Sequence, residues 1–302
     1  MNSSNPRLAI ALAGFFLIVS PPLLSEASEE SEQPSTLEEA ESEHQFEQTR
    51  TCTPSGIHSC DPGQEPLPVQ WNRQTVDYEI HSEGSPKFHP GEELTDDLKH
   101  SVIESFDTWN EPECANFEMV YAGQNPSDRI GWDDSIPPED NVNIVVWQDD
   151  QWPYPQYNAI ALTTVTFSRS SGEILSADVE LNSAEHNFTD TDDSVEIDLR
   201  NTLTHEVGHF LGLDHSPNGD ATMAPTAPIG ETSKRDLHNA DLAGLCFIYS
   251  DDWAANVPEN GGGGSEGSSS SSCSTTSQSP APAFLLAALL IGATAIRRRS
   301  MG

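Results

Sequence analysis

Residues 205–215 read His-Glu-Val-Gly-His-Phe-Leu-Gly-Leu-Asp-His. On a helix, His205 and His209 are one turn apart, so both imidazoles lie on one face at the spacing that a metal ion needs. Glu206 follows the first of them directly. Gly212 can adopt a left-handed conformation, which would end the helix and bring His215 back as a third nitrogen ligand.

Three imidazoles and one open position are typical of a catalytic zinc site, because structural zinc sites are closed by four protein ligands. The spacing therefore predicts one zinc ion on His205, His209 and His215, with Glu206 close to the metal-bound water as its base. The alternative is a helix with two solvated histidines and a third in the next loop. Helix formation does not require His at these three positions together with Glu and Gly.

A methionine turn supports the same interpretation. Met223 lies in the run Ala-Thr-Met-Ala-Pro at 221–225, after the zinc motif and Ser216. The pattern His-Glu-x-x-His-x-x-Gly-x-x-His followed by such a turn is the metzincin signature. The chain resembles the matrixin branch of that clan over most of residues 69–250.

This resemblance implies roles for single residues. The three histidines would bind zinc, Glu206 would be the general base, and Met223 would form the hydrophobic floor beneath the metal. Asp241 would support the methionine turn by hydrogen bonding. An extended substrate would pair with an edge strand, for which the implied candidate is 174–181, and the pocket walled by residues 225–229 would set side-chain preference.

The sequence also departs from the family. A Pro-Arg-Cys-Gly prosegment box is missing, and Cys60, the nearest candidate for a thiolate cap, is expected instead in a disulfide with Cys52. His186 stands alone where many relatives have a loop for a second zinc, and Ala240 replaces an acid. Calcium is the alternative to solvated charge for acidic loops such as 190–193, but no calcium-loop spacing is present.

Periodicity predicts the elements of one domain of α/β or α+β class, which we place at residues 67–252, and the resemblance favours the α+β class. The resemblance implies a metzincin-like fold: a twisted mixed sheet of about five short strands with three main helices, in which the active-site helix precedes the methionine turn and a C-terminal helix. The expected strands are 69–71, 76–80, 117–121, 142–147, 160–167 and 174–181. The expected helices are 92–110, 198–213 and 234–249.

The N-terminal part of the chain indicates export. Residues 1–27 contain one arginine, an apolar run and a small-residue cleavage site after Ala27, which predicts a signal peptide. A short membrane anchor is the alternative, but about a dozen apolar residues are too few to span a bilayer. Residues 28–66 form an acidic segment that we expect to be a mostly disordered prosegment or stalk.

The C-terminal part indicates sorting. A Gly/Ser-rich linker at 253–280 precedes an apolar segment with an arginine cluster at 281–302. The order of Cys273, apolar run and arginines resembles the sorting tags of the MYXO-CTERM type, which implies cell-surface display or secretion. The alternative is a retained transmembrane anchor, since sixteen mostly apolar residues at 281–296 are just short of spanning length.

Net charge limits the classes of binding partner, and the cysteines indicate disulfides. The formal net charge is -36, with 13 Lys and Arg against 49 Asp and Glu, which argues against a nucleic-acid partner. Pairing Cys52 with Cys60 and Cys114 with Cys246 is favoured, although four cysteines allow three connectivities.

We therefore expect an exported, monomeric zinc-dependent endopeptidase that acts on protein or peptide substrates, with a C-terminal tag that engages the membrane or sorting machinery. The alternatives are a catalytically silent binding or adhesion module on the same scaffold and a zinc hydrolase of non-peptide amides.

Overall fold

The computed structural model describes residues 7–13, 16–18, 46–53, 59–91, 93–155, 159–192 and 195–250. The predicted cleavage site after Ala27, the linker at 253–280 and the apolar segment at 281–302 lie outside these residues. Among the residues that are described, no helix is both long and apolar enough to cross a membrane.

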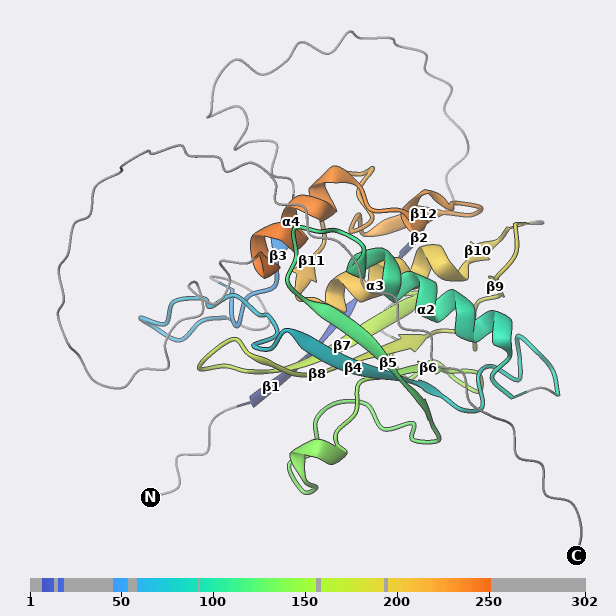
Figure 1. The fold of residues 1–302 in the computed structure, drawn as a ribbon, viewed down its shortest axis with the longest axis horizontal. Helices are drawn as coiled ribbons and strands as arrows, with labels where there is room; N and C mark the ends of the chain where they lie inside the picture. The colour runs from blue at the N-terminus through green and yellow to red at the C-terminus, as the bar shows by residue number, and fades with distance from the viewer. Residues whose placement is uncertain are drawn as a thin grey trace, which may run out of the picture. The chain divides into compact units, whose positions relative to one another are not determined.

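A six-stranded mixed sheet forms the centre of the fold (Figure 1). Its strands are, in spatial order, β1 (Arg7–Ala13), β7 (Ala161–Ser168), β8 (Ile174–Leu181), β6 (Ile144–Trp147), β4 (Thr75–His81) and β5 (Glu118–Asn125). Neighbours from β8 to β5 are parallel, whereas β7 runs antiparallel to β8 and β1 antiparallel to β7. The five strands β4 to β8 confirm the expected mixed sheet. The expected strand at 69–71 is wrong, because Gln70 makes only an isolated bridge with Glu173.

Two helices lie on one face of this sheet, and the segment that contains η1 (Pro138–Asp140) lies on the other (Figure 1). Helix α2 (Asp96–Asn110) begins at Thr95, whose hydroxyl accepts a hydrogen bond from the backbone N–H of Leu98. Its buried positions Leu98, Val102, Phe106 and Trp109 recur every three or four residues, as the periodicity predicts.

Helix α3 (Leu199–Phe210) runs through the interior, and every one of its residues except Arg200 is buried. Large aromatic side chains hold its C-terminal part. Trp109 Nε1 donates to the carbonyl of Thr204 at 2.8 Å, Trp71 Nε1 to that of Phe210 at 2.9 Å, and the Tyr249 hydroxyl to that of Leu211 at 2.7 Å. The bonds to Phe210 and Leu211 satisfy carbonyls at the helix end, where the last turn has no further backbone N–H of its own to donate to them.

The expected helix boundaries shift at three places. Helix α2 begins at Asp96 rather than at residue 92, because Thr95 caps it there. Helix α3 ends at Phe210 rather than at residue 213, because Leu213 and Asp214 form strand β11 (Leu213–Asp214). Helix α4 (Asn239–Tyr249) begins later than residue 234, because His238 and Asp241 form a reciprocal capping box there. Residues before it form the short 3-10 helix η2 (Ser233–Arg235).

Short strand pairs connect the periphery to the domain. β9 (Phe188–Thr189) pairs with β10 (Ile197–Asp198), β11 with β3 (Glu47–Gln48), and β12 (Thr226–Pro228) with β2 (Phe16–Ile18). Gln48, Thr49 and Cys52 are buried. The end of the acidic segment therefore packs on the domain instead of remaining outside it.

The structure contains the two expected disulfides, Cys52–Cys60 and Cys114–Cys246. The second joins the residues after α2 to helix α4 across 132 positions of sequence. Closing so long a loop stabilises the fold by about 5 kcal/mol in the chain-entropy model.

Candidate metal centre

The turn after α3 brings the third histidine back to the helix. Gly212 has φ 92°, and a Cβ at this position would lie 2.3 Å from the carbonyl oxygen of Val69. Only glycine fits both the left-handed backbone and the close approach. The Gly212 carbonyl accepts a hydrogen bond from the backbone N–H of Thr49 at 2.9 Å, which fixes the turn before β11.

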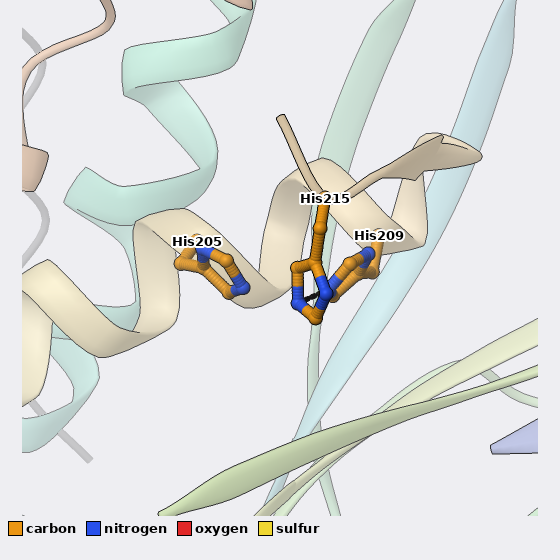
Figure 2. Close-up of side chains that lie close together, drawn as sticks. All are labelled: His205, His209 and His215. Carbon is orange, nitrogen blue, oxygen red and sulfur yellow. Dashed lines mark hydrogen bonds between the residues drawn. The ribbon is translucent and has the colours of Figure 1, made fainter. Parts of the chain in front are cut away.

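Three imidazoles converge at this point (Figure 2). His205 and His209 project from α3 and His215 from the segment after β11, and one ring nitrogen from each lies within 4.8 Å of the others. The Nε2 atoms of His209 and His215 are 3.2 Å apart, as the dashed line in Figure 2 marks. The structure thus brings together the three residues that the sequence proposes as ligands.

Backbone carbonyls orient two of the rings. His205 Nδ1 lies 2.6 Å from the carbonyl oxygen of Thr222, and His209 Nδ1 lies 2.8 Å from that of Leu213. A carbonyl can only accept, so in each ring Nδ1 carries the hydrogen and Nε2 keeps a lone pair directed inward. Sequence reasoning missed these two carbonyls, because a backbone acceptor leaves no trace in residue type.

Burial keeps the imidazoles neutral. Desolvation lowers the pKa of His209 to about 4 and, together with the nearby His209 ring, that of His215 to about 3. It also lowers the pKa of His205 well below the usual value, with smaller contributions from His209, His215 and Lys234. Neutral imidazole is the form that binds metal ions.

The donor set fits zinc. Three neutral ring nitrogens are borderline-soft ligands of the kind zinc prefers, and they leave room for a fourth, non-protein ligand. The Nε2 atoms of His209 and His215 lie 3.2 Å apart, close enough for both to bind one cation. Sulfur and carboxylate ligands are absent from this group, which comprises histidines alone among the described residues.

Glu206 lies beside the ligands in the interior. Its side chain is fully buried, and Oε2 accepts a hydrogen bond from the hydroxyl of Thr163 on β7 at 2.6 Å. A carboxylate at this depth needs such a donor, because burying an unpaired charge is costly. Thr163 was not among the sequence-derived site residues.

The methionine turn packs against helix α3. Met223 is buried, and a Cβ on Gly208 would lie 2.1 Å from its sulfur atom, so the turn approaches α3 between the two helical ligands. The backbone N–H of Ser216 donates to the Met223 carbonyl at 2.8 Å, which connects the turn to the segment of His215.

Asp241 anchors this turn from α4. Its carboxylate accepts from the backbone N–H groups of Thr222 at 2.7 Å, Met223 at 3.0 Å and His238 at 3.0 Å. Since the Thr222 carbonyl in turn orients His205, Asp241 is connected to the first ligand through a single residue.

The edge of the sheet differs from the expectation. The candidate substrate strand at 174–181 is wrong, because this strand, β8, is interior and pairs with β6 on one side and β7 on the other. The outer edge of the domain's own sheet is β7, which pairs antiparallel with residues 7–13, while residues 16–18 pair parallel with β12.

A buried lysine supports β12 from behind. Lys234 Nζ donates to the carbonyls of Ala224 at 3.0 Å and Thr226 at 2.5 Å, and Glu231 lies 3.8 Å away. Desolvation lowers the pKa of this lysine. Lys234 thereby holds the segment after the methionine turn, in the wall where the sequence places a specificity pocket.

The weaker expectations lie elsewhere. Cys60 is paired in its disulfide, away from any role as a thiolate cap. In the acidic loop, Asp190 pairs with His89 at 3.3 Å and Asp192 with Arg235 at 2.7 Å, so both carboxylates have protein partners. His186 lies outside the histidine group.

Comparison with known proteins agrees with this geometry. A protein-family model described as matrixin, of the M10 peptidases, matches residues 70–250. Metalloendoproteinase 1-MMP of Arabidopsis thaliana is 28% identical over 186 residues, which cover 60% of this chain and 44% of that protein. Human neutrophil collagenase is 25% identical over 183 residues, or 60% of this chain and 33% of that protein. Human matrix metalloproteinase-26 is 23% identical over 192 residues, or 63% of each chain. The similarity thus spans less than two thirds of each of these relatives.

Proposed function

The chain belongs to the matrixin family of metallopeptidases, and from this premise we propose that it is a zinc-dependent endopeptidase with Glu206 as its general base. One observation carries the proposal: three inward-facing imidazole nitrogens lie within 4.8 Å of one another, beside a buried carboxylate. A structural zinc site is closed by four protein ligands, whereas a catalytic site has three and an open fourth position.

Each residue has a defined part in the proposed reaction. His205, His209 and His215 would hold the zinc, which when bound supplies Lewis acidity to polarise the scissile carbonyl and lower the pKa of a water. Glu206 takes a proton from the attacking water and later donates it to the leaving amine. This pathway hydrolyses the peptide bond without a covalent intermediate, and Met223 and Asp241 keep the ligands in place.

We propose that a substrate binds in extended form between β7 and β12. The backbone pairing of residues 7–13 with β7 and of residues 16–18 with β12 supports this mode, because one continuous stretch of chain can satisfy both edges. Main-chain hydrogen bonds of this kind provide affinity and register without dictating sequence. Preference for particular side chains would come from the wall at 225–229.

The test compares the protein with its Glu206→Gln variant on a pool of denatured proteins and peptides. We expect the parent to cleave internal bonds, a chelator to abolish cleavage and added zinc to restore it. Glu206→Gln should bind zinc and remain inactive, because an amide cannot take the proton. Glu118→Gln, the same change at an exposed position of β5, is the matched control and should stay active. Equal cleavage by the parent and Glu206→Gln would refute the proposal.

A catalytically silent adhesion module on this scaffold is not favoured, because Glu206 and all three ligands are in place. Export also belongs to the proposal. We infer from the sequence that residues 1–27 are removed and that the C-terminal segment directs the protein to the cell surface or the medium. Mass spectrometry of the secreted product would show both termini, and retention of residue 1 in that product would contradict the inference.

A further inference from the structure

Strand β7 contacts helix α3 through a buried side-chain hydrogen bond, in addition to apolar packing. Thr163 and Glu206 are both fully buried. The Thr163 hydroxyl oxygen lies 2.6 Å from Glu206 Oε2 and 3.1 Å from the Glu206 backbone carbonyl oxygen. A hydroxyl has one hydrogen to donate, and the shorter distance is typical of a hydrogen bond to a charged carboxylate.

Thr163 is a rigid donor. Its β-branched side chain has few rotamers, and it sits within β7, which pairs with β8 so that Thr163 lies opposite Val179. Glu206, by contrast, has a long side chain whose carboxylate could adopt several positions if nothing held it. Helix α3 fixes the backbone of Glu206, and the Thr163 hydroxyl restricts the carboxylate at the far end of the side chain.

Position matters because a general base must lie within hydrogen-bond reach of the proton that it takes. Misplacement of a catalytic group by about 1 Å lowers the rate by about 10²-fold. The two helical ligands do not depend on Thr163, since the ring orientations of His205 and His209 are set by the carbonyls of Thr222 and Leu213.

We propose that Thr163 is a positioning residue for the general base: its hydroxyl holds the Glu206 carboxylate in the orientation that the chemical step needs. This inference rests on the proposed peptidase function. Because Thr163 would act through Glu206 and not through the substrate, its loss should lower kcat and leave KM unchanged.

The first experiment uses Thr163→Val, which replaces the hydroxyl by a methyl group of similar shape. In the full-length zinc-loaded protein, kcat on a cleaved peptide should fall by about 10- to 100-fold while KM stays within about twofold. Thr163→Ser keeps the donor and should recover most of kcat. Thr108→Val removes a hydroxyl that donates to a backbone carbonyl of α2, outside the site, and should leave both constants unchanged. An unchanged kcat in Thr163→Val, or a Thr163→Ser protein as slow as Thr163→Val, would overturn the inference.

The second experiment does not need activity. In zinc-free protein that keeps Glu206, Thr163→Val should lower the denaturant midpoint of unfolding, because it removes a hydrogen bond to a buried carboxylate oxygen. In the Glu206→Ala background the same change should have a smaller effect, because the bond to the carboxylate is already absent and the hydroxyl contacts only the backbone carbonyl of residue 206 there. An equal decrease in both backgrounds would show that the hydroxyl does not act through Glu206. If the parent has no zinc-dependent peptidase activity, the proposed function fails, and this coupling alone decides whether Thr163 holds Glu206.

Discussion

The two faces of the central sheet bury carboxylates in different ways. On the α3 side, Glu206 lies beside three imidazoles and accepts a hydrogen bond from the Thr163 hydroxyl. On the other side, Asp178 of β8 accepts from the backbone N–H groups of Gly131 at 2.7 Å and Ile144 at 3.0 Å. Glu180 of the same strand accepts from Gln148 and Tyr154, each at 2.7 Å.

This difference distinguishes the two carboxylates that connect the sheet to neighbouring segments from the one that lies beside the candidate metal ligands. Asp178 and Glu180 have donors on both oxygens and connect strands and loops to β8, whereas Glu206 adjoins the candidate metal ligands. Alternation along β7 separates the two environments, because Thr163 pairs with Val179 and faces the core while Thr164 pairs with Asp178.

Removal of a candidate metal ligand on the α3 face should have the largest effect on zinc content and activity. In His209→Ala we expect zinc content to fall from about one ion per chain to near zero and peptidase activity to fall to background, because two imidazoles cannot complete the site. Metal analysis by mass spectrometry and a peptide assay measure both. His186→Ala, outside the histidine group, should retain both zinc and activity. Full zinc content in His209→Ala would remove the distinction between the two faces.

The next largest effect should come from the sheet edge between these faces. Residues 7–13 pair with β7, so a chain that starts at residue 28 should have an open edge and cleave peptides at least about tenfold faster than the full chain. The tethered segment competes at an effective concentration on the order of millimolar. Removal of residues 281–302 serves as the control and should not change the rate. Equal kcat/KM for the two N-terminal forms would contradict occupation of the edge.

Asp241→Asn should weaken zinc binding without abolishing it, which is a smaller effect than the loss of a ligand. The carboxylate accepts from three backbone N–H groups, and an amide would direct its own N–H₂ toward one of them. Because the Thr222 carbonyl orients His205, we expect zinc affinity to fall by about 10- to 100-fold. Competition with a chromogenic chelator measures it. Asp220→Asn, in an exposed loop, should bind zinc like the parent, and the same affinity in Asp241→Asn would show that the turn does not need this anchor.

The smallest effect concerns stability on the scaffold side. Burial raises the pKa of Asp178 to about 7, against backbone hydrogen bonds that lower it. Between pH 4 and about 7 the folded protein then keeps a proton that the unfolded chain has lost, so this group's stabilisation falls as pH rises. Asp178→Asn should reduce that slope by up to ~1.4 kcal/mol per pH unit in denaturant unfolding, while zinc content stays unchanged. A slope identical to that of the parent would argue against the raised pKa.

The strongest sequence predictions were those that depend on local spacing. The order of strands and helices and the convergence of the three histidines follow from periodicity and from residue types within eleven positions. The errors arose where tertiary contacts decide. Leu213 leaves the helix because Gly212 must pass close to Val69, and β8 is interior because β7 continues the sheet beyond it.

Residue types and their spacing therefore predict the three histidines, the glycine turn and the methionine after it, because each depends on neighbours along the chain. The groups that hold the histidines and Glu206 can be identified only in the folded protein. Thr163, the Thr222 carbonyl and the Asp241 carboxylate come from a strand, a turn and the last helix, and their roles arise from distances across the fold. A threonine in the run Thr-Thr-Val-Thr at 163–166 is ordinary for a strand, so nothing in its residue type marks the one that faces Glu206.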